Sequence, residues 1–316
     1  MPPELVALAA RQGGVLTTAQ LLAAGLTPRE LARRVRLGAL QAVRRGVFVD
    51  AALWRMWSAD DRYRALVVGT LLCGDRDAVA SHESAAILLG LARFGAWPDI
   101  VHVTVGSASG SRHSGRVRRH VAALPAGSVT TSLGFRVTAP ARTGVDLARG
   151  RDFRLAVVTL DAALRRSDVS RDELAGALAG CAGWRGASAA ARAVAFADAR
   201  SESVGESLSR VILHQQGLAP DDLQHELYSP DGFVGRSDFW WEAARTAGEF
   251  DGKLKYGAID PAKDPREVLW AEKKREDRIR DLDAQVVRWT WWDLEHPEGW
   301  LGRLRSALAR GRRRAA

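Results

Sequence analysis

Cysteine, whose abundance marks whole classes of protein, is scarce in this 316-residue chain. The chain has two cysteines, Cys73 and Cys181, which lie far apart in the sequence and in apolar surroundings. This argues against a disulfide scaffold and against a zinc site with paired-cysteine spacing, so we expect two free, buried thiols in a reducing cytoplasm. No hydrophobic run approaches the roughly 20 residues of a membrane span. The first residues also lack the pattern of a secretory signal, so a cytoplasmic protein without a membrane partner is expected.

Motifs for nucleotide binding and for serine hydrolysis are missing as well. There is no glycine-rich phosphate loop and no Gly-x-Ser-x-Gly elbow. Basic residues outnumber acidic residues, which gives a formal net charge of +9 and a pI near 10.3. A basic surplus favours phosphate-bearing partners such as DNA. The length suggests two or three folded domains.

The most informative stretch is residues 235–256, GRSDFWWEAARTAGEFDGKLKY. It predicts two short strands, residues 236–242 and 248–256, joined by a turn. Successive strand residues point to opposite faces, so three charged side chains of the second strand share one face. An aspartate of the first strand can lie beside them. These four residues are Asp238, Glu249, Asp251 and Lys253.

Such a group of charges needs a compensating partner. Like charges on neighbouring strands repel, and a covered carboxylate loses hydration. Mg²⁺ or Mn²⁺ would remove both costs, because hard cations prefer oxygen ligands. We therefore predict a metal site at Asp238, Glu249 and Asp251. A solvated hairpin face is the alternative, but the aromatic run at 239–241 indicates a buried strand.

An aspartate, a turn and then acid-x-Lys on the next strand resembles the PD-(D/E)xK nuclease superfamily. The EFDG segment looks most like the very-short-patch-repair-endonuclease-like domains. Ser237 stands where the motif's proline would be, which removes one element of the match. The resemblance implies a restriction-endonuclease-like α/β core with α-β-β-β-α-β order and metal-dependent cleavage of DNA. Whether Glu249 or Asp251 is the acid of the acid-x-Lys element stays open.

The same resemblance implies an acid on the preceding helix, for which Glu206 fits better than Glu202. A metal ion held by the carboxylates would polarise the scissile phosphate. A metal-bound water, oriented by Lys253 or by Glu206, would then attack in line. The predicted catalytic set is Glu206, Asp238, Glu249, Asp251 and Lys253.

A highly charged helix is expected over residues 266–282 and resembles the family's basic helix. That likeness implies contacts of Lys273, Arg275 and Arg278 with the DNA backbone, and a surface helix covered with ion pairs is the alternative. The arginines of residues 310–314 are expected to form a disordered electrostatic arm.

The first 50 residues predict a winged helix-turn-helix. Thr27, Pro28 and Glu30 form the capping-box signature of a third helix, and Arg45-Gly46 indicates a tight hairpin. In this fold the third helix enters the major groove and the hairpin meets phosphate. A solvated helix face is the alternative. The predicted DNA-binding arginines are Arg29, Arg33, Arg34, Arg36, Arg44 and Arg45.

Residues 17–49, TTAQLLAAGLTPRELARRVRLGALQAVRRGVFV, also resemble the N-terminal domain of the AbiEi-type antitoxin and transcriptional-regulator family. That resemblance implies operator binding, autorepression and a cognate toxin as partner. Within the middle segment, VTAPARTGVDLA resembles the connecting domain of the same family, which implies a scaffold role. We interpret His82-Glu83 as a helix-start hydrogen-bonding element, and Arg116 to His120 as a basic strand edge.

The sequence therefore predicts an α+β chain of three parts. These are a winged helix over 1–56, a middle α/β domain over 57–200 and a nuclease-like domain over 201–316. The favoured function is a DNA-binding protein with a Mg²⁺-dependent endonuclease domain. The alternative is an AbiEi-like antitoxin and autorepressor that retains an inactive nuclease-like scaffold. The sequence does not indicate the oligomeric state.

Overall fold

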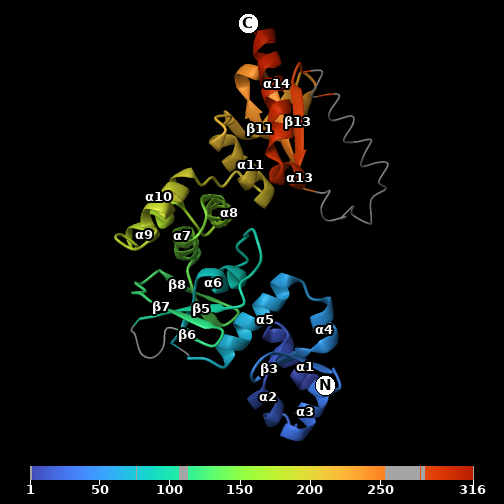
Figure 1. The fold of residues 1–316 in the computed structure, drawn as a ribbon, viewed down its shortest axis with the longest axis vertical. Coiled ribbons are helices and arrows are strands. Elements are labelled where there is room, and N and C mark those ends of the chain that lie inside the picture. The colour runs from blue at the N-terminus through green and yellow to red at the C-terminus, as the bar shows by residue number, and fades with distance from the viewer. Residues whose placement is uncertain (1, 76, 107–112, 253–277, 279–281, 316) are drawn as a thin grey trace. The chain divides into compact units, whose positions relative to one another are not determined.

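The computed structural model describes residues 2–75, 77–106, 113–252, 278 and 282–315. The chain forms two compact units, Met1–Ala195 and Phe196–Ala316 (Figure 1). No helix in the described part of the chain is long and apolar enough to cross a membrane. The predicted mixture of helices and sheets is confirmed.

The N-terminal segment has an element order and a sheet consistent with a winged helix. Three short helices precede a β-hairpin, and a three-stranded antiparallel sheet runs in the order β1-β3-β2. Its elements are α1 (Pro3–Arg11), β1 (Val15–Thr17), α2 (Thr18–Ala23), α3 (Pro28–Arg36), β2 (Leu40–Arg44) and β3 (Val47–Asp50).

Helix α3 begins at the predicted capping box. The Thr27 hydroxyl accepts a hydrogen bond from the backbone N–H of Glu30 at 3.2 Å, and the Glu30 carboxylate accepts one from the N–H of Thr27 at 2.8 Å. Leu31 is buried, and Val35 packs against the same apolar cluster. Because these two residues fix the inner side of the helix, its arginines are directed away from the core.

The rest of the first unit is a six-stranded sheet with helices packed on it. The strand order is β6-β7-β5-β4-β9-β8. Its strands are β4 (Val79–Ala80), β5 (Val101–Val105), β6 (His113–Ser114), β7 (Val117–Val121), β8 (Val129–Ser132) and β9 (Phe135–Thr138). The helices are α4 (Ala51–Met56), α5 (Ala59–Leu72), α6 (His82–Leu89), α7 (Pro140–Gly150), α8 (Phe153–Leu164), α9 (Arg171–Ala179) and α10 (Ala187–Phe196).

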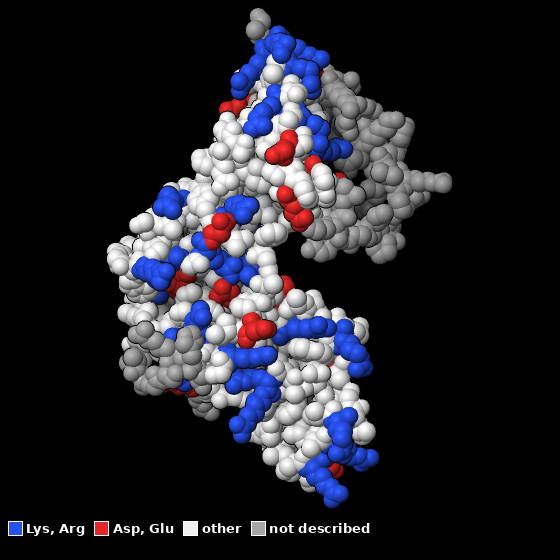
Figure 2. All heavy atoms as spheres, viewed as in Figure 1, with Lys and Arg blue, Asp and Glu red and all other residues white. Residues whose placement is uncertain are grey.

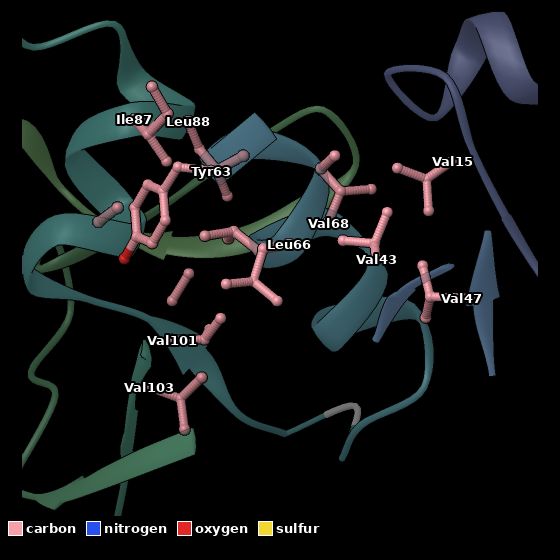
Figure 3. Close-up of a cluster of buried hydrophobic side chains, with 14 of the residues drawn as sticks. Val15, Val43, Val47, Tyr63, Leu66, Val68, Ile87, Leu88, Val101 and Val103 are labelled. Carbon is pink, nitrogen blue, oxygen red and sulfur yellow. The ribbon is translucent and has the colours of Figure 1, made fainter. Parts of the chain in front are cut away.

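One apolar cluster joins the winged-helix strands to α5 and the six-stranded sheet. Figure 3 shows Val15 and Val47 facing Val68 of α5, with Val101 further along the same core. Gly69 permits the close approach, because a Cβ atom there would collide with the side chain of Val47. The N-terminal strands therefore share their core with the segment that follows them.

Two predictions about this unit are wrong in detail. Cys181 is buried as predicted, but Cys73 is exposed. Cys73 directly follows the last residue of α5, at the end of the helix. Strand β7 is not the sheet edge, since the two-residue strand β6 pairs with it on one side and β5 on the other.

The second unit is a four-stranded mixed sheet in the order β10-β11-β12-β13. The first three strands are antiparallel neighbours, and β12 and β13 run parallel. Trp289 of β13 is fully buried, stacks on Trp300 and donates its indole N–H to Ser209 of the first helix. The elements are α11 (Val204–Gln215), β10 (Asp222–Ser229), β11 (Gly232–Trp241), β12 (Thr246–Asp251), β13 (Gln285–Thr290), α13 (Trp291–Glu295) and α14 (Pro297–Ala315).

The C-terminal arginines are helical, which contradicts the predicted disordered arm. Helix α14 continues through them, and Arg314 donates to Asp283 at 3.0 Å while Arg310 donates to Gln285 at 3.1 Å. The buried face of α14 around Leu304 and Leu308 holds the helix on the sheet. Packing therefore orders a segment whose composition alone suggests a free tail.

Candidate functional site

Three arginines form an exposed row on helix α3. Arg29, Arg33 and Arg36 fall at i, i+4 and i+7, and all three are exposed. Arg34 is half-buried. Figure 2 shows basic side chains gathered at the end of the N-terminal unit where α3 lies. This row has the position that a recognition helix requires of its phosphate- and base-contacting residues.

The two arginines of the hairpin differ from each other. Arg45 lies exposed beside Gly46, whose φ of +79° closes the turn between β2 and β3. Arg44 is half-buried and lines a cavity of about 200 Å³ together with Arg119 and Cys73. Arg45 is thus the more accessible of the two residues predicted to meet phosphate.

In the second unit, two of the predicted acids lie opposite each other on adjacent strands. Phe239 pairs with Gly248, so Asp238 and Glu249 occupy the next position of the β11–β12 pair. Asp238 accepts a hydrogen bond from the backbone N–H of Phe250 at 2.7 Å. On β10, the other neighbouring strand, Gln224 has a left-handed φ of +55°. It is not among the paired residues of β10 and β11, although its place in the strand is opposite Asp238.

Helix α11 adds the third acid. Glu206 is buried, and its carboxylate accepts hydrogen bonds from the Gln224 amide and from the backbone N–H of Glu202, both at 2.8 Å. Burial raises the pKa of Asp238 to about 7, with further contributions from the nearby Glu206 and Glu249 carboxylates. Asp238 therefore retains a proton at a pH where an ordinary aspartate is ionised.

The remaining members of the predicted catalytic set are placed differently. Glu249 is buried and accepts a hydrogen bond from Arg288 of β13 at 2.9 Å, so it already has a cationic partner. Asp251 is half-buried at the end of β12. Arg278 is exposed and donates to the carbonyl of Phe233 at 3.3 Å. Lys253, Lys273 and Arg275 lie outside the described residues.

A different group of potential ligands lies in the first unit. His82, His102 and His120 come from α6, β5 and β7, and their nearest ligand atoms all lie within 4.8 Å of one another. Among the described residues, these histidines are the group of three potential metal ligands whose ligand atoms all lie close together. The rings of His82 and His120 stack with centroids 3.9 Å apart.

Each of the three histidine rings has a polar neighbour close to one of its nitrogen atoms. The Nδ1 atom of His102 lies 3.0 Å from Nε2 of His120. Nδ1 of His82 lies 3.1 Å from the hydroxyl oxygen of Ser81. Nε2 of His102 faces the carboxylate of Glu83 at 3.7 Å, and that carboxylate accepts from Arg151 at 2.6 Å.

Burial sets the charge state of these imidazoles. It lowers the pKa of His82 and of His120 to about 3, and it also lowers the pKa of His102. All three rings are therefore neutral near pH 7, which is the form of histidine that coordinates metal ions.

The histidines open onto a large, mainly basic cavity of about 1060 Å³. Asp146 in the cavity wall pairs with Arg142 at 2.8 Å and with Arg149 at 3.2 Å. Both guanidinium groups also lie over the ring of Trp184. Arg118, Arg119 and Arg185 line the cavity as well.

Sequence reasoning missed this cluster. It treated His82-Glu83 as a helix start and assigned His120 to a basic edge, without connecting them to each other or to His102. The three histidines are separated by 20 and 18 residues, which matches no metal-ligand spacing. Alternation along the strands would have put His102 and His120 on definite faces of the sheet, but only the packing of α6 on β5 brings His82 to them.

The element order and the sheet of residues 1–50 are consistent with a winged helix. Residues 3–49 match the family model described as "Transcriptional regulator, AbiEi antitoxin". Residues 78–196 match the model described as "AbiEi antitoxin C-terminal domain". Two segments of the chain are therefore similar to AbiEi antitoxin domains, and the cavity with its three histidines lies in the second of these segments.

Curated relatives and a solved structure are also similar to this chain. The uncharacterized proteins MT2308 and Rv2248 of Mycobacterium tuberculosis (strains CDC 1551 / Oshkosh and ATCC 25618 / H37Rv) are each 35% identical over 177 residues. That match covers 56% of this chain and 62% of each relative. The crystal structure of the RV2827C protein from Mycobacterium tuberculosis is 15% identical, with a TM-score of 0.36, over 72% of this chain and 88% of that one.

Proposed function

We propose that this chain is a DNA-binding transcriptional regulator of the AbiEi antitoxin type. The observation that carries the proposal is the exposed row of Arg29, Arg33 and Arg36 on the third helix of a family-matched winged-helix segment. Such a helix lies in the major groove, where guanidinium groups donate to guanine edges or to phosphates. The net charge of +9 would assist association with DNA.

Binding to DNA from upstream of the chain's own gene tests this proposal. We expect the wild-type protein to shift that fragment in a gel at moderate salt, with EDTA present. The double variant Arg29→Ala/Arg33→Ala should lose roughly 10- to 100-fold in affinity, since each base or phosphate contact contributes on the order of 1 kcal/mol or more. The slope of log affinity against log salt should fall by about one for each phosphate contact removed.

A charge-matched control separates the recognition helix from general basicity. Arg154→Ala/Arg171→Ala removes two exposed arginines at the starts of α8 and α9 and leaves α3 intact. This control should bind the fragment like the wild type. Equal losses in both double variants would reject α3 as the recognition helix.

A cognate toxin is the protein partner that this proposal implies. Support comes from the second family match over residues 78–196, which carries the name of an antitoxin domain. Autorepression and toxin neutralisation would then be divided between the two matched domains. Co-expression with the product of the neighbouring gene, followed by co-purification, is the direct measurement.

A second candidate function is metal-dependent cleavage of DNA by the second unit. What favours it is the association of Asp238 with Glu206 and Glu249 at one place on the mixed sheet, with the pKa of Asp238 raised to about 7. Mg²⁺ or Mn²⁺ would offset the repulsion between these carboxylates and polarise a bound phosphate. Both family matches end by residue 196, so this candidate rests on the site alone.

Cleavage of supercoiled plasmid and of labelled single and double strands tests the second candidate. We expect nicking with Mg²⁺ or Mn²⁺, none with EDTA, and a loss of at least about 100-fold in Asp238→Asn. Asp231→Asn, an exposed aspartate in the β10–β11 turn, is the matched control and should cut normally. Metal-dependent cutting that survives in Asp238→Asn would reject this site.

A further inference from the structure

Three histidines that line the cavity of the first unit bring their ring nitrogens close together. They are contributed by three separate elements, α6, β5 and β7. We propose that His82, His102 and His120 together bind one divalent transition-metal ion, for which zinc is the best chemical match. A remaining coordination position of the ion would face the arginine-lined cavity.

The distances favour coordination by these atoms. Zinc binds imidazole nitrogen at about 2.0–2.1 Å, so two nitrogens in a tetrahedral site lie about 3.3 Å apart. Nδ1 of His102 and Nε2 of His120 are 3.0 Å apart, and the third ligand atom completes a group within 4.8 Å. The rings of His82 and His120 are stacked, so binding would require these side chains to rotate until all three donors point at one ion.

Contacts with neighbouring side chains determine which ring nitrogen of His82 and of His102 is available to an ion. Since Nδ1 of His82 is engaged by the Ser81 hydroxyl, its Nε2 is the atom left for an ion. Nε2 of His102 faces Glu83, which leaves Nδ1 for an ion. A carboxylate behind a metal-bound histidine fixes the tautomer and increases the basicity of the ligand. Arg151 in turn fixes that carboxylate.

The backbone at His82 is strained in the same place. Its φ of +51° lies in the left-handed region, which few residues other than glycine adopt, with asparagine, aspartate and histidine the commonest exceptions. Helix α6 begins at this residue without a side-chain cap from Ser81, whose hydroxyl engages the His82 ring instead. Strain of this kind is concentrated at sites where a side chain must be held in a set position.

The donor set and the charges select the class of ion. Three imidazole nitrogens suit zinc and neighbouring transition metals, and they do not suit Mg²⁺ or Ca²⁺, which require oxygen. Glu83 and Asp146 offset part of the basic lining, because Arg151, Arg142 and Arg149 are paired with them. Arg118, Arg119 and Arg185 would favour water or an anionic ligand in the open position.

Zinc retention by the full chain tests the proposal. All proteins carry Cys73→Ser, which removes the exposed thiol as a competing ligand. Each protein is stripped with EDTA, given one equivalent of ZnCl₂, dialysed and analysed for zinc by mass spectrometry. We expect about one zinc ion per chain, a higher Tm with zinc than without it, and an X-ray absorption spectrum of imidazole coordination.

The variants locate the bound ion. His102→Gln, His120→Gln and His82→Asn should each retain at least about ten-fold less zinc. Asparagine is chosen at position 82 because it tolerates the left-handed backbone. His296→Gln, at an exposed histidine immediately after α13, should retain zinc like the parent.

Two results would overturn the proposal. One is a parent protein that keeps no zinc, which is decided without any variant. The other is zinc retained at the parent level by two of the three histidine variants, which would place the ion elsewhere. Circular dichroism identifies a variant that fails to fold, and the other two variants and the absorption spectrum then decide. The result is independent of DNA binding and of cleavage, since neither activity is measured.

Discussion

The carboxyl group of Asp238 is buried beside two other carboxyl groups, and both the burial and these neighbours disfavour its ionised form. Water would ordinarily stabilise its charge, and burial removes that water. The hydrogen bond from Phe250 N–H opposes the effect but does not cancel it. The residue therefore titrates near neutrality, and its charge state is linked to the stability of the unit.

Asp238→Asn is expected to stabilise the metal-free protein at alkaline pH. In the unfolded chain the carboxyl titrates near 4, and in the folded chain at about 7. Between these values the folded state binds the extra proton, so the free energy of unfolding falls as pH rises from about 4 to about 7. Asparagine avoids this loss, and the variant should gain on the order of 2–4 kcal/mol at pH 8.

Urea unfolding in EDTA, followed by tryptophan fluorescence at pH 5 and pH 8, measures the effect. The advantage of Asp238→Asn over the wild type should grow with pH. Asp231→Asn, in the exposed turn, should follow the wild type at both values. A stability difference that does not change between pH 5 and pH 8 would contradict the raised pKa.

Helix α3 shows how local sequence positions a whole element. Its first turn is fixed by Thr27, Pro28 and Glu30, and its inner side by Leu31 and Val35. These signals are contiguous in the sequence, so both the start of the helix and its exposed arginines were predicted correctly. The element is short, and its N-terminal hydrogen bonds are a large share of its support.

Thr27→Ala should weaken DNA binding without removing any contact to DNA. Losing the hydroxyl acceptor leaves the N–H of Glu30 without its cap and costs about 1 kcal/mol of stability. The first turn, which carries Arg29, should fray and lower affinity by several-fold. Gel shifts and thermal unfolding of Thr27→Ala measure both effects.

Thr18→Ala is the control for this change. Thr18 is the first residue of α2 and is not its cap, because Thr17 supplies that hydroxyl. Alanine is well tolerated at a helical position, so stability and DNA binding should remain near wild type. A Thr27→Ala protein as stable as this control would show that the capping box contributes little.

Across the whole molecule, the candidate sites of the two units are built from different kinds of side chain. The first family match lies within the first unit, and the second ends one residue beyond it. The histidine-lined cavity belongs to the first unit. The carboxylate site lies entirely in the second unit. The proposals of DNA recognition, zinc binding and DNA cleavage therefore rest on different residues, and single substitutions can test each one separately.

Much of this arrangement is determined by the sequence itself. Capping boxes, strand alternation and glycine turns are local, and they predicted α3, β5, β11 and the approach of Asp238 to Glu249. Tertiary packing decided the rest. The pairing of Glu249 with Arg288 depends on a parallel strand almost 40 residues away, and the ordering of the basic C-terminal helix depends on the sheet beneath it. The histidine cluster depends on the packing of α6 against β5 and on β7 beside it, because contacts between distant residues are fixed only when a common core brings their elements together.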